Sequence, residues 1–132
     1  MCIRDRSNNF YNIAPAVSPD GSQVVYFTDN MGYIDIYIID ATTGKKIKRV
    51  VKGNRSIEFE ELKLLQPGVS WSPDGKKIVI AAKAGSKDAF HIINSRNGDS
   101  KKIPFDLEGV FTPKWSPDGT KLAFVGLSLI HI

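Results

Sequence analysis

A four-residue turn that occurs three times constrains the fold of this chain more than any other feature. Ser-Pro-Asp-Gly stands at residues 18–21, 72–75 and 116–119, at spacings of 54 and 44 residues. Proline presets φ at the first central turn position, aspartate can bond the nearby backbone, and glycine accepts the left-handed conformation. Because internal repeats decide an architecture, we expect copies of one unit built around a tight hairpin.

The first two copies stay in register over a whole unit. Gly21 to Gly44 and Gly75 to Gly98 both span 23 residues, and the apolar runs inside them align without a gap. We expect four antiparallel strands per copy: a short strand before the turn, a β-branched and aromatic run after it, and two more strands around a polar turn. The first strands end at Val17, Trp71 and Trp115; the second begin near Val24, Ile78 and Leu122; the third cover 34–40 and 89–94; the fourth cover 46–51 and 101–105.

Four short strands in 40 to 45 residues, with the turn in a fixed place, are typical of a propeller blade. We therefore predict an all-β fold: a fragment of a β-propeller with about two and a half four-stranded antiparallel blades. The blades fall at about 14–52, 67–106 and 111–126, and only the segment 57–65 has an ambiguous helical pattern.

So few blades cannot close a ring, because closed propellers use about 4 to 8. We interpret the chain as part of a longer protein whose remaining blades are one of its partners. Trp71, Trp115 and Phe124 are then expected to lie partly uncovered on the open blade faces.

The two ends of the chain do not fit the repeat. Residues 1–6, MCIRDR, and 127–132, LSLIHI, resemble translated adaptor sequence at the edges of metagenomic reading frames. We interpret both as non-native ends, although the apolar tail can extend the last strand, and we assign residues 7–126 to the partial propeller.

Composition argues against two classes of partner. The net charge is +4, but the lysines occur as scattered pairs among acids, so we interpret them as solvated turns and expect no nucleic-acid partner. No segment approaches the roughly 20 apolar residues of a membrane span, so we expect no membrane insertion. The lysine pairs are 45–46, 76–77 and 101–102.

No residue pattern for catalysis, cofactor binding or metal binding is present. The sequence lacks a Gly-x-Ser-x-Gly elbow, a phosphate-binding glycine loop and a His-Glu-x-x-His motif, and Cys2 is its single cysteine. We therefore predict no catalytic, cofactor or metal residues, no cofactor, and no enzyme activity. Asp20, Asp74 and Asp118 could converge on one ion, but the turn position favours bonds to local backbone.

Two further kinds of side chain could suggest a ligand site. His91 stands where the first copy has Tyr37, which favours a packing role on a strand face. Trp71 and Trp115 could stack on a ligand, yet their equivalent strand positions favour the core between blades.

One connection departs from the repeat. Gly44 lies 28 residues before the second turn, whereas Gly98 lies 18 residues before the third, so the first connection carries ten extra residues within Gly53–Leu65. In a meander this insertion projects from the rim opposite the Ser-Pro-Asp-Gly turns, and loops on one face often form binding surfaces. The alternative is a variable loop or an extra edge strand without a partner.

The Trp-Ser-Pro-Asp-Gly-Lys-Lys-Ile form at 71–78, with strands such as Asp-Ile-Tyr-Ile-Ile-Asp at 35–40, resembles the WD-like repeats of TolB-type β-propellers. The resemblance covers about residues 14–126. It implies a non-catalytic scaffold for protein or ligand binding within a larger bacterial envelope protein. A periplasmic or other extracytoplasmic location and an envelope protein as partner are also implied.

The same resemblance leaves two other functions open. One is the non-catalytic propeller domain of a prolyl-oligopeptidase-like serine peptidase. The other is a structural module of a large multidomain envelope protein. Fold alone does not decide among them.

Overall fold

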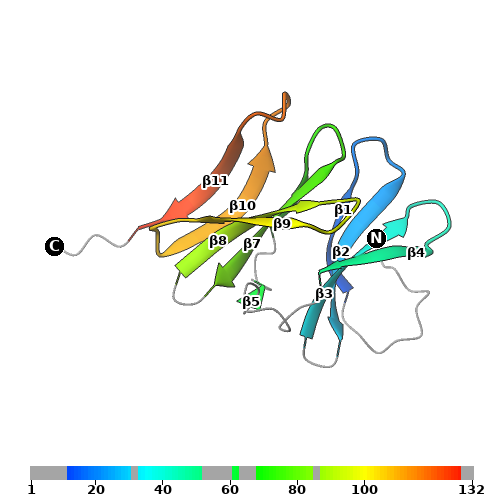
Figure 1. The fold of residues 1–132 in the computed structure, drawn as a ribbon, viewed down its shortest axis with the longest axis horizontal. Coiled ribbons are helices and arrows are strands. Elements are labelled where there is room, and N and C mark those ends of the chain that lie inside the picture. Colours follow the sequence, from blue (N-terminus) through cyan, green and yellow to red (C-terminus); the bar gives the residue numbers. More distant parts are fainter. Residues whose placement is uncertain (1–11, 31–32, 52–60, 63–67, 85–86, 129–132) are drawn as a thin grey trace.

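The computed structural model describes residues 12–30, 33–51, 61–62, 68–84 and 87–128 (Figure 1). This part of the chain consists of strands and turns and contains no helix, so it holds no helix that could span a membrane. The strands are β1 (Asn12–Val17), β2 (Gln23–Asn30), β3 (Tyr33–Asp40), β4 (Lys46–Val51), β5 (Glu61–Leu62), β6 (Val69–Trp71), β7 (Lys77–Ala84), β8 (Lys87–Asn94), β9 (Ser100–Pro104), β10 (Gly109–Trp115) and β11 (Leu122–Leu127).

These strands form three antiparallel sheets that correspond to the three repeats. The first sheet has the order β1-β2-β3-β4, and the last sheet pairs β10 with β11. The middle sheet joins β7, β8 and β9, and both β5 and β6 pair with the inner side of β7. The expected two four-stranded blades and the first two strands of a third are confirmed.

The blades stack face to face, so the second blade, which lies between the other two, buries both faces of its central strands. Val25 lies opposite Ile38 in the first blade, and Val79 lies opposite Ile92 in the second, which is the same register in both copies. Such strands read as continuous apolar runs because neither face meets water.

The core between the first two blades takes alternate residues from each. Val25, Phe27, Ile36 and Ile38 of the first blade pack against apolar side chains of the second. Those side chains are Val69, Trp71, Ile78, Ile80, Ala82 and Ile93.

The opposite face of the second blade packs on the third. Val79, Ala81 and Phe90 form a cluster with Val110, and Trp115 lies partly buried beside it. Adjacent residues of β7 therefore serve different interfaces, as the two-residue period of a strand requires.

Exposure of the aromatic residues depends on which blade is next to them. Val125 is 59% exposed on β11, as expected for an open face. Phe124 is 37% exposed, as expected for a partly uncovered residue, but its ring faces the second blade, where it packs on Phe90 and Phe105. Trp71 is only 8% exposed, so the expectation that it lies uncovered is wrong. It points toward the first blade, which covers it.

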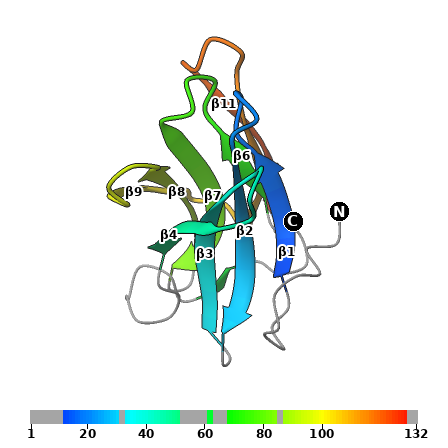
Figure 2. The same ribbon diagram turned by 90° about the vertical axis from the view of Figure 1, so that its right-hand side faces the viewer.

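The hairpin turns gather at one end of the molecule. Figure 2 shows the β1–β2, β6–β7 and β10–β11 turns at the same end. The turns between the third and fourth strands join them, because the Ala41 amide donates to the Ser22 carbonyl and the Ser95 amide donates to the Lys76 carbonyl, both at 2.9 Å. We call residues 18–23, 40–49, 72–77, 94–102 and 116–121 the turn rim, and the opposite end the loop rim.

Candidate functional site

Each Ser-Pro-Asp-Gly turn is held by a serine that bonds in two directions. Ser72 Oγ donates to Asp74 Oδ1 at 2.6 Å and accepts from the Lys77 amide at 2.9 Å. Asp74 Oδ1 also accepts from the Lys76 amide at 2.9 Å. Gly75 has φ 71°, which closes the turn and lets its amide donate to the Ser72 carbonyl.

The other two copies repeat this arrangement with one addition. Asp20 Oδ1 accepts from Ser18 Oγ at 2.7 Å and from both the amide and the hydroxyl of Ser22. Asp118 Oδ1 accepts from Ser116 Oγ at 2.5 Å and from both the amide and the hydroxyl of Thr120. The expected bonding of all three aspartates to local groups is what the structure contains.

These hydrogen bonds keep the turn carboxylates ionised. The serine hydroxyl, followed by the amide two residues on, lowers the pKa of Asp20 and of Asp118 to about 2. The pKa of Asp74 is lowered for the same reasons, with Ser72 first. Within the described part of the chain, no three His, Cys, Asp or Glu side chains are grouped closely enough to hold a metal ion.

A groove of about 490 Å³ lies on the turn rim between the first and second blades. Its walls include Asp20 and Gln23 from the first hairpin turn and Asp74 from the second. Lys48 and Arg96 complete it, and the Lys48 ammonium donates to the Arg96 carbonyl across the blade boundary. Burial, and then the nearby Arg96 charge, lower the pKa of Lys48.

A second hollow, of about 540 Å³, lies along the inner strands of all three blades. Ala14 and Thr112 line it, with φ of 52° and 47°, and a proline follows each of them. The pairing of β1 and of β10 shifts by one residue at these positions. Strained backbone and β-bulges of this kind concentrate at functional surfaces.

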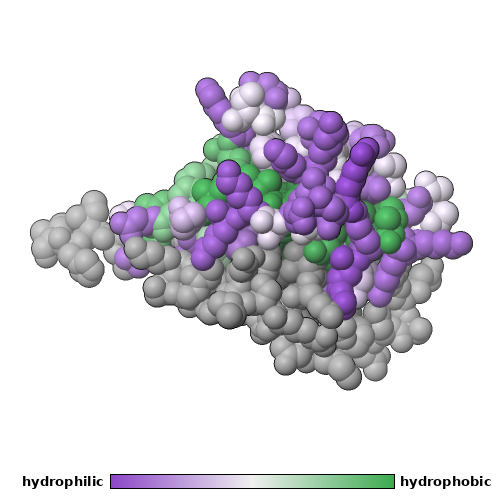
Figure 3. All heavy atoms as spheres, in the orientation of Figure 1, coloured by the Kyte–Doolittle hydropathy of each residue, from purple (hydrophilic) through white to green (hydrophobic). Residues whose placement is uncertain are grey.

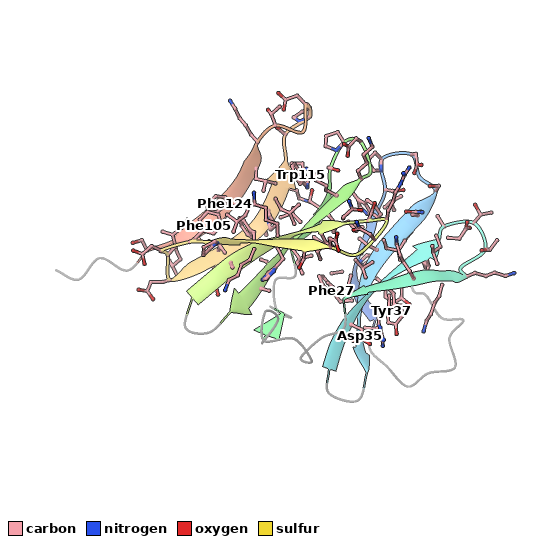
Figure 4. The ribbon with its side chains drawn as sticks, viewed as in Figure 1. Phe27, Asp35, Tyr37, Phe105, Trp115 and Phe124 are labelled. Carbon is pink, nitrogen blue, oxygen red and sulfur yellow. The ribbon has the colours of Figure 1, made fainter. Side chains whose placement is uncertain are left out.

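The outer face of the first blade carries polar contacts that hold its edge strand (Figure 4). Asp35 is buried and lies 3.5 Å from the Arg49 guanidinium. Tyr37 stacks on Tyr26 at a centroid distance of 6.1 Å, and the Lys46 ammonium lies 4.4 Å from the Tyr37 ring centroid. These contacts fasten β4 to β3 and leave no reactive arrangement.

The remaining singled-out side chains are packing residues. His91 is fully buried and lies opposite Ile80 in the β7–β8 ladder. Trp71 Nε1 donates to the Ala16 carbonyl of the preceding blade at 2.9 Å, and Trp71 and Trp115 join separate clusters between blades. The expected packing role of His91 and the expected core role of both tryptophans agree with this placement.

The insertion lies mostly outside the described residues. Of Gly53–Leu65, the structure describes β5, whose Glu61 and Leu62 lie opposite Lys83 and Ala82 at the loop-rim end of β7. This contact agrees with the expected rim and with an added edge strand. Whether the rest of the insertion contacts a partner stays a prediction.

The sequence matches a family model described as the TolB beta propeller domain over residues 4–128. The chain belongs to this TolB β-propeller family. The predicted resemblance and the predicted class, an all-β fragment of a β-propeller, are both confirmed.

Relatives of this TolB-family chain include TolB homologues and a protein named as a peptidase. A protein TolB homolog of Chlorobium luteolum is 28% identical, over 86% of this chain and 23% of its own length. The uncharacterized peptidase YuxL of Bacillus subtilis is 25% identical, over 82% of this chain and 16% of its own length. The crystal structure of TolB from Acinetobacter baumannii shares the fold, with a TM-score of 0.73, 21% identity, and coverage of 92% of this chain and 28% of that one.

Two features of these surfaces escaped the sequence analysis. The strained inner-strand positions could have been found, because Ala14-Pro15 and Thr112-Pro113 both stand at the same distance before the turn serine. The gathering of lysine pairs on one rim could not be read from spacing, since it depends on which turns share an end of the sheets.

Proposed function

We propose that the chain is part of a non-catalytic scaffold that binds another protein, within a larger TolB-like protein outside the cytoplasm. The proposal rests on the hydrogen bonds made by the polar side chains that recur in the three turns. The turn serines and aspartates are engaged in intramolecular hydrogen bonds that shape the turn rim. The described surface therefore offers grooves for contact and no assembled nucleophile and base.

We place an envelope protein on the loop rim that carries the insertion. The ten added residues bring Phe59 among Glu58, Glu60 and Glu61. Aromatic anchors surrounded by polar groups concentrate binding energy at protein interfaces. The second blade has no matching segment, so the first connection supplies a surface that the repeat itself does not need.

A second candidate function is the propeller domain of a prolyl-oligopeptidase-like serine peptidase. The similarity to the Bacillus subtilis peptidase favours it, since 82% of this chain aligns with that protein. In that case the catalytic serine would belong to a separate α/β-hydrolase domain. A structural module within a multidomain envelope protein is the third possibility, and it would show neither partner capture nor peptidase activity.

Labelling the full-length protein with a fluorophosphonate probe separates the peptidase function from the two non-catalytic functions. The probe reacts with activated serines, which require a neighbouring base and an oxyanion site. The scaffold function predicts no labelling beyond that of a heat-denatured control. Stoichiometric labelling that a peptide chloromethyl ketone blocks would contradict it and establish the peptidase alternative.

A further inference from the structure

The turn rim gathers basic residues that are dispersed in the sequence. Over residues 18–23, 40–49, 72–77, 94–102 and 116–121, ten lysines and arginines stand against five aspartates, a net charge of +5. The whole chain carries +4, so all other residues together carry −1. Arg49 is paired with Asp35, which lies outside these ranges, so the charge of the rim without that arginine is +4. Figure 3 shows hydrophilic side chains crowded over β4 and β9 on one face of the molecule. The fold therefore separates charge that looks evenly scattered along the chain.

The basic residues of the first two blades form one continuous surface. The Lys76 carbonyl accepts from the Ser95 amide, and Lys77 lies opposite Asn94 in the β7–β8 ladder. The next residue, Arg96, accepts the Lys48 ammonium at its carbonyl. The groove of about 490 Å³ on this rim is lined by two basic residues, Lys48 and Arg96, and by Gly75, which precedes Lys76 in the chain.

Protection of sheet edges explains only part of this charge. Lysines on exposed edge strands prevent pairing between molecules, and β4 and β9 are edge strands of their sheets. Lys77 is the first residue of β7, which has neighbours on both sides, and Lys76 precedes it in the turn. Both are exposed, and neither forms an ion pair with another described residue.

The aspartates of the turn rim favour an acidic protein segment over a nucleic acid as the anionic partner. Asp20, Asp74 and Asp118 are exposed, and their turn hydrogen bonds keep them ionised. A nucleic acid presents phosphates at short, regular intervals and would meet these carboxylates. A protein segment with spaced acidic residues can pair with the lysines and avoid the aspartates. Ile47, 46% exposed beside Lys48, offers that segment an apolar contact.

We propose that the turn rim is a docking surface for an acidic segment of a protein partner. Electrostatic complementarity of this kind raises association rates and selects partners. The surface lies opposite the loop rim, so it is a second site. This proposal rests on the proposed function only in assigning a protein partner. Its test leaves the insertion at residues 53–65 unchanged, so the two proposals can fail separately.

Charge reversal on the two rims provides a matched test in the full chain. The probe is a fluorescein-labelled peptide of alternating glutamate and serine, followed by anisotropy at physiological ionic strength. Lys76→Glu/Lys77→Glu changes the turn rim, and Lys83→Glu/Lys87→Glu makes the same change at the far end of β7 and the start of β8. We expect the first to weaken binding at least about tenfold and the second by less than about threefold, because charges beyond a Debye length of about 8 Å are screened.

The two rims can still be compared if one of the charge-reversal variants folds poorly. Circular dichroism checks each variant, and the neutral pairs Lys76→Gln/Lys77→Gln and Lys83→Gln/Lys87→Gln replace any reversal that unfolds. Absence of peptide binding, or equal losses in the two variants, would overturn the proposal. Tighter binding of single-stranded DNA, or of vesicles containing phosphatidylserine, would also overturn it and assign the rim to that ligand.

Discussion

The serine and aspartate of each turn determine how this protein responds to acid. A carboxyl group whose pKa is lower in the folded state stabilises the fold above its unfolded pKa and loses that effect as pH falls through the folded pKa. For Asp20 and Asp118 this window runs from 3.8 down to about 2. We expect the free energy of unfolding, measured by urea titration, to decline across it.

The double variant Asp20→Asn/Asp118→Asn tests the origin of that decline. Asparagine accepts hydrogen bonds from the same hydroxyl and amide groups but does not titrate. The variant should therefore show a shallower loss of stability between pH 4 and pH 2 than the wild type. An unchanged slope would show that other carboxyl groups control acid unfolding.

The same turn aspartates should not bind calcium. In each turn Oδ1 already accepts hydrogen bonds from the serine hydroxyl and a backbone amide, and the three turns belong to different blades. Calorimetric titration with calcium should show no saturable heat. A saturable site that disappears in Asp20→Ala, Asp74→Ala or Asp118→Ala would contradict this assignment.

Residue roles were predictable where they depend on local sequence. The turn chemistry of Asp74 follows from its neighbours Pro73 and Gly75, so the pattern alone predicted its bonds. The surroundings of Lys76 depend on Ser95 and Arg96, which the sheet brings from the next turn. Sequence spacing does not show this proximity, so the lysines look scattered along the chain.

At the scale of the strands, a tryptophan hydrogen bond links the first two blades. Trp71 Nε1 donates to the Ala16 carbonyl, whereas the buried Trp115 Nε1 has no hydrogen-bond partner in the described part of the chain. Trp71→Phe should therefore destabilise the protein by about 1 kcal/mol more than Trp115→Phe, the usual net value of one hydrogen bond. Equal losses in urea unfolding would show that ring packing alone accounts for both.

Gly68, the residue before β6, lies close against β10 of the third blade. A β-carbon there would lie 2.5 Å from Pro113 Cδ and 2.8 Å from the Thr112 α-carbon. Gly68→Ala should cost about 1–3 kcal/mol, because backbone atoms must move. Gly126→Ala is the control, since its nearest atom is the movable Leu107 Cδ1. A loss no larger than that of the control would mean that β6 and β10 are less tightly apposed.

The presence of the strands was predictable from the repeat, whereas the bulges and the exact pairing between strands were not. The run from Ile78 to Ile80 identified β7 because both blade faces are apolar. The bulges at Ala14 and Thr112 arise where the inner strands curve past each other, and such offsets depend on neighbouring blades. The placement of β5 opposite Ala82 likewise needs the folded sheet.

At the scale of the whole molecule, the blades form a stack whose two rims differ in chemistry. The turn rim is basic and shaped by repeated hydrogen bonds, and the loop rim carries the one connection that breaks the repeat. The family and the blade order follow from the sequence pattern. The sequence pattern does not show which rim binds a partner, because every copy of the repeat contributes connections to both rims.

Shortening the insertion in the full-length protein tests whether the loop rim binds the protein partner. We compare the wild type with a variant lacking ten residues of Gly53–Leu65, and measure both capture of the protein partner and the melting temperature. Because the second blade folds its equivalent connection without these residues, we expect capture to be lost while the melting temperature is preserved. Capture that survives the deletion, or a fold that collapses with it, would contradict the assignment of the loop rim as the binding surface.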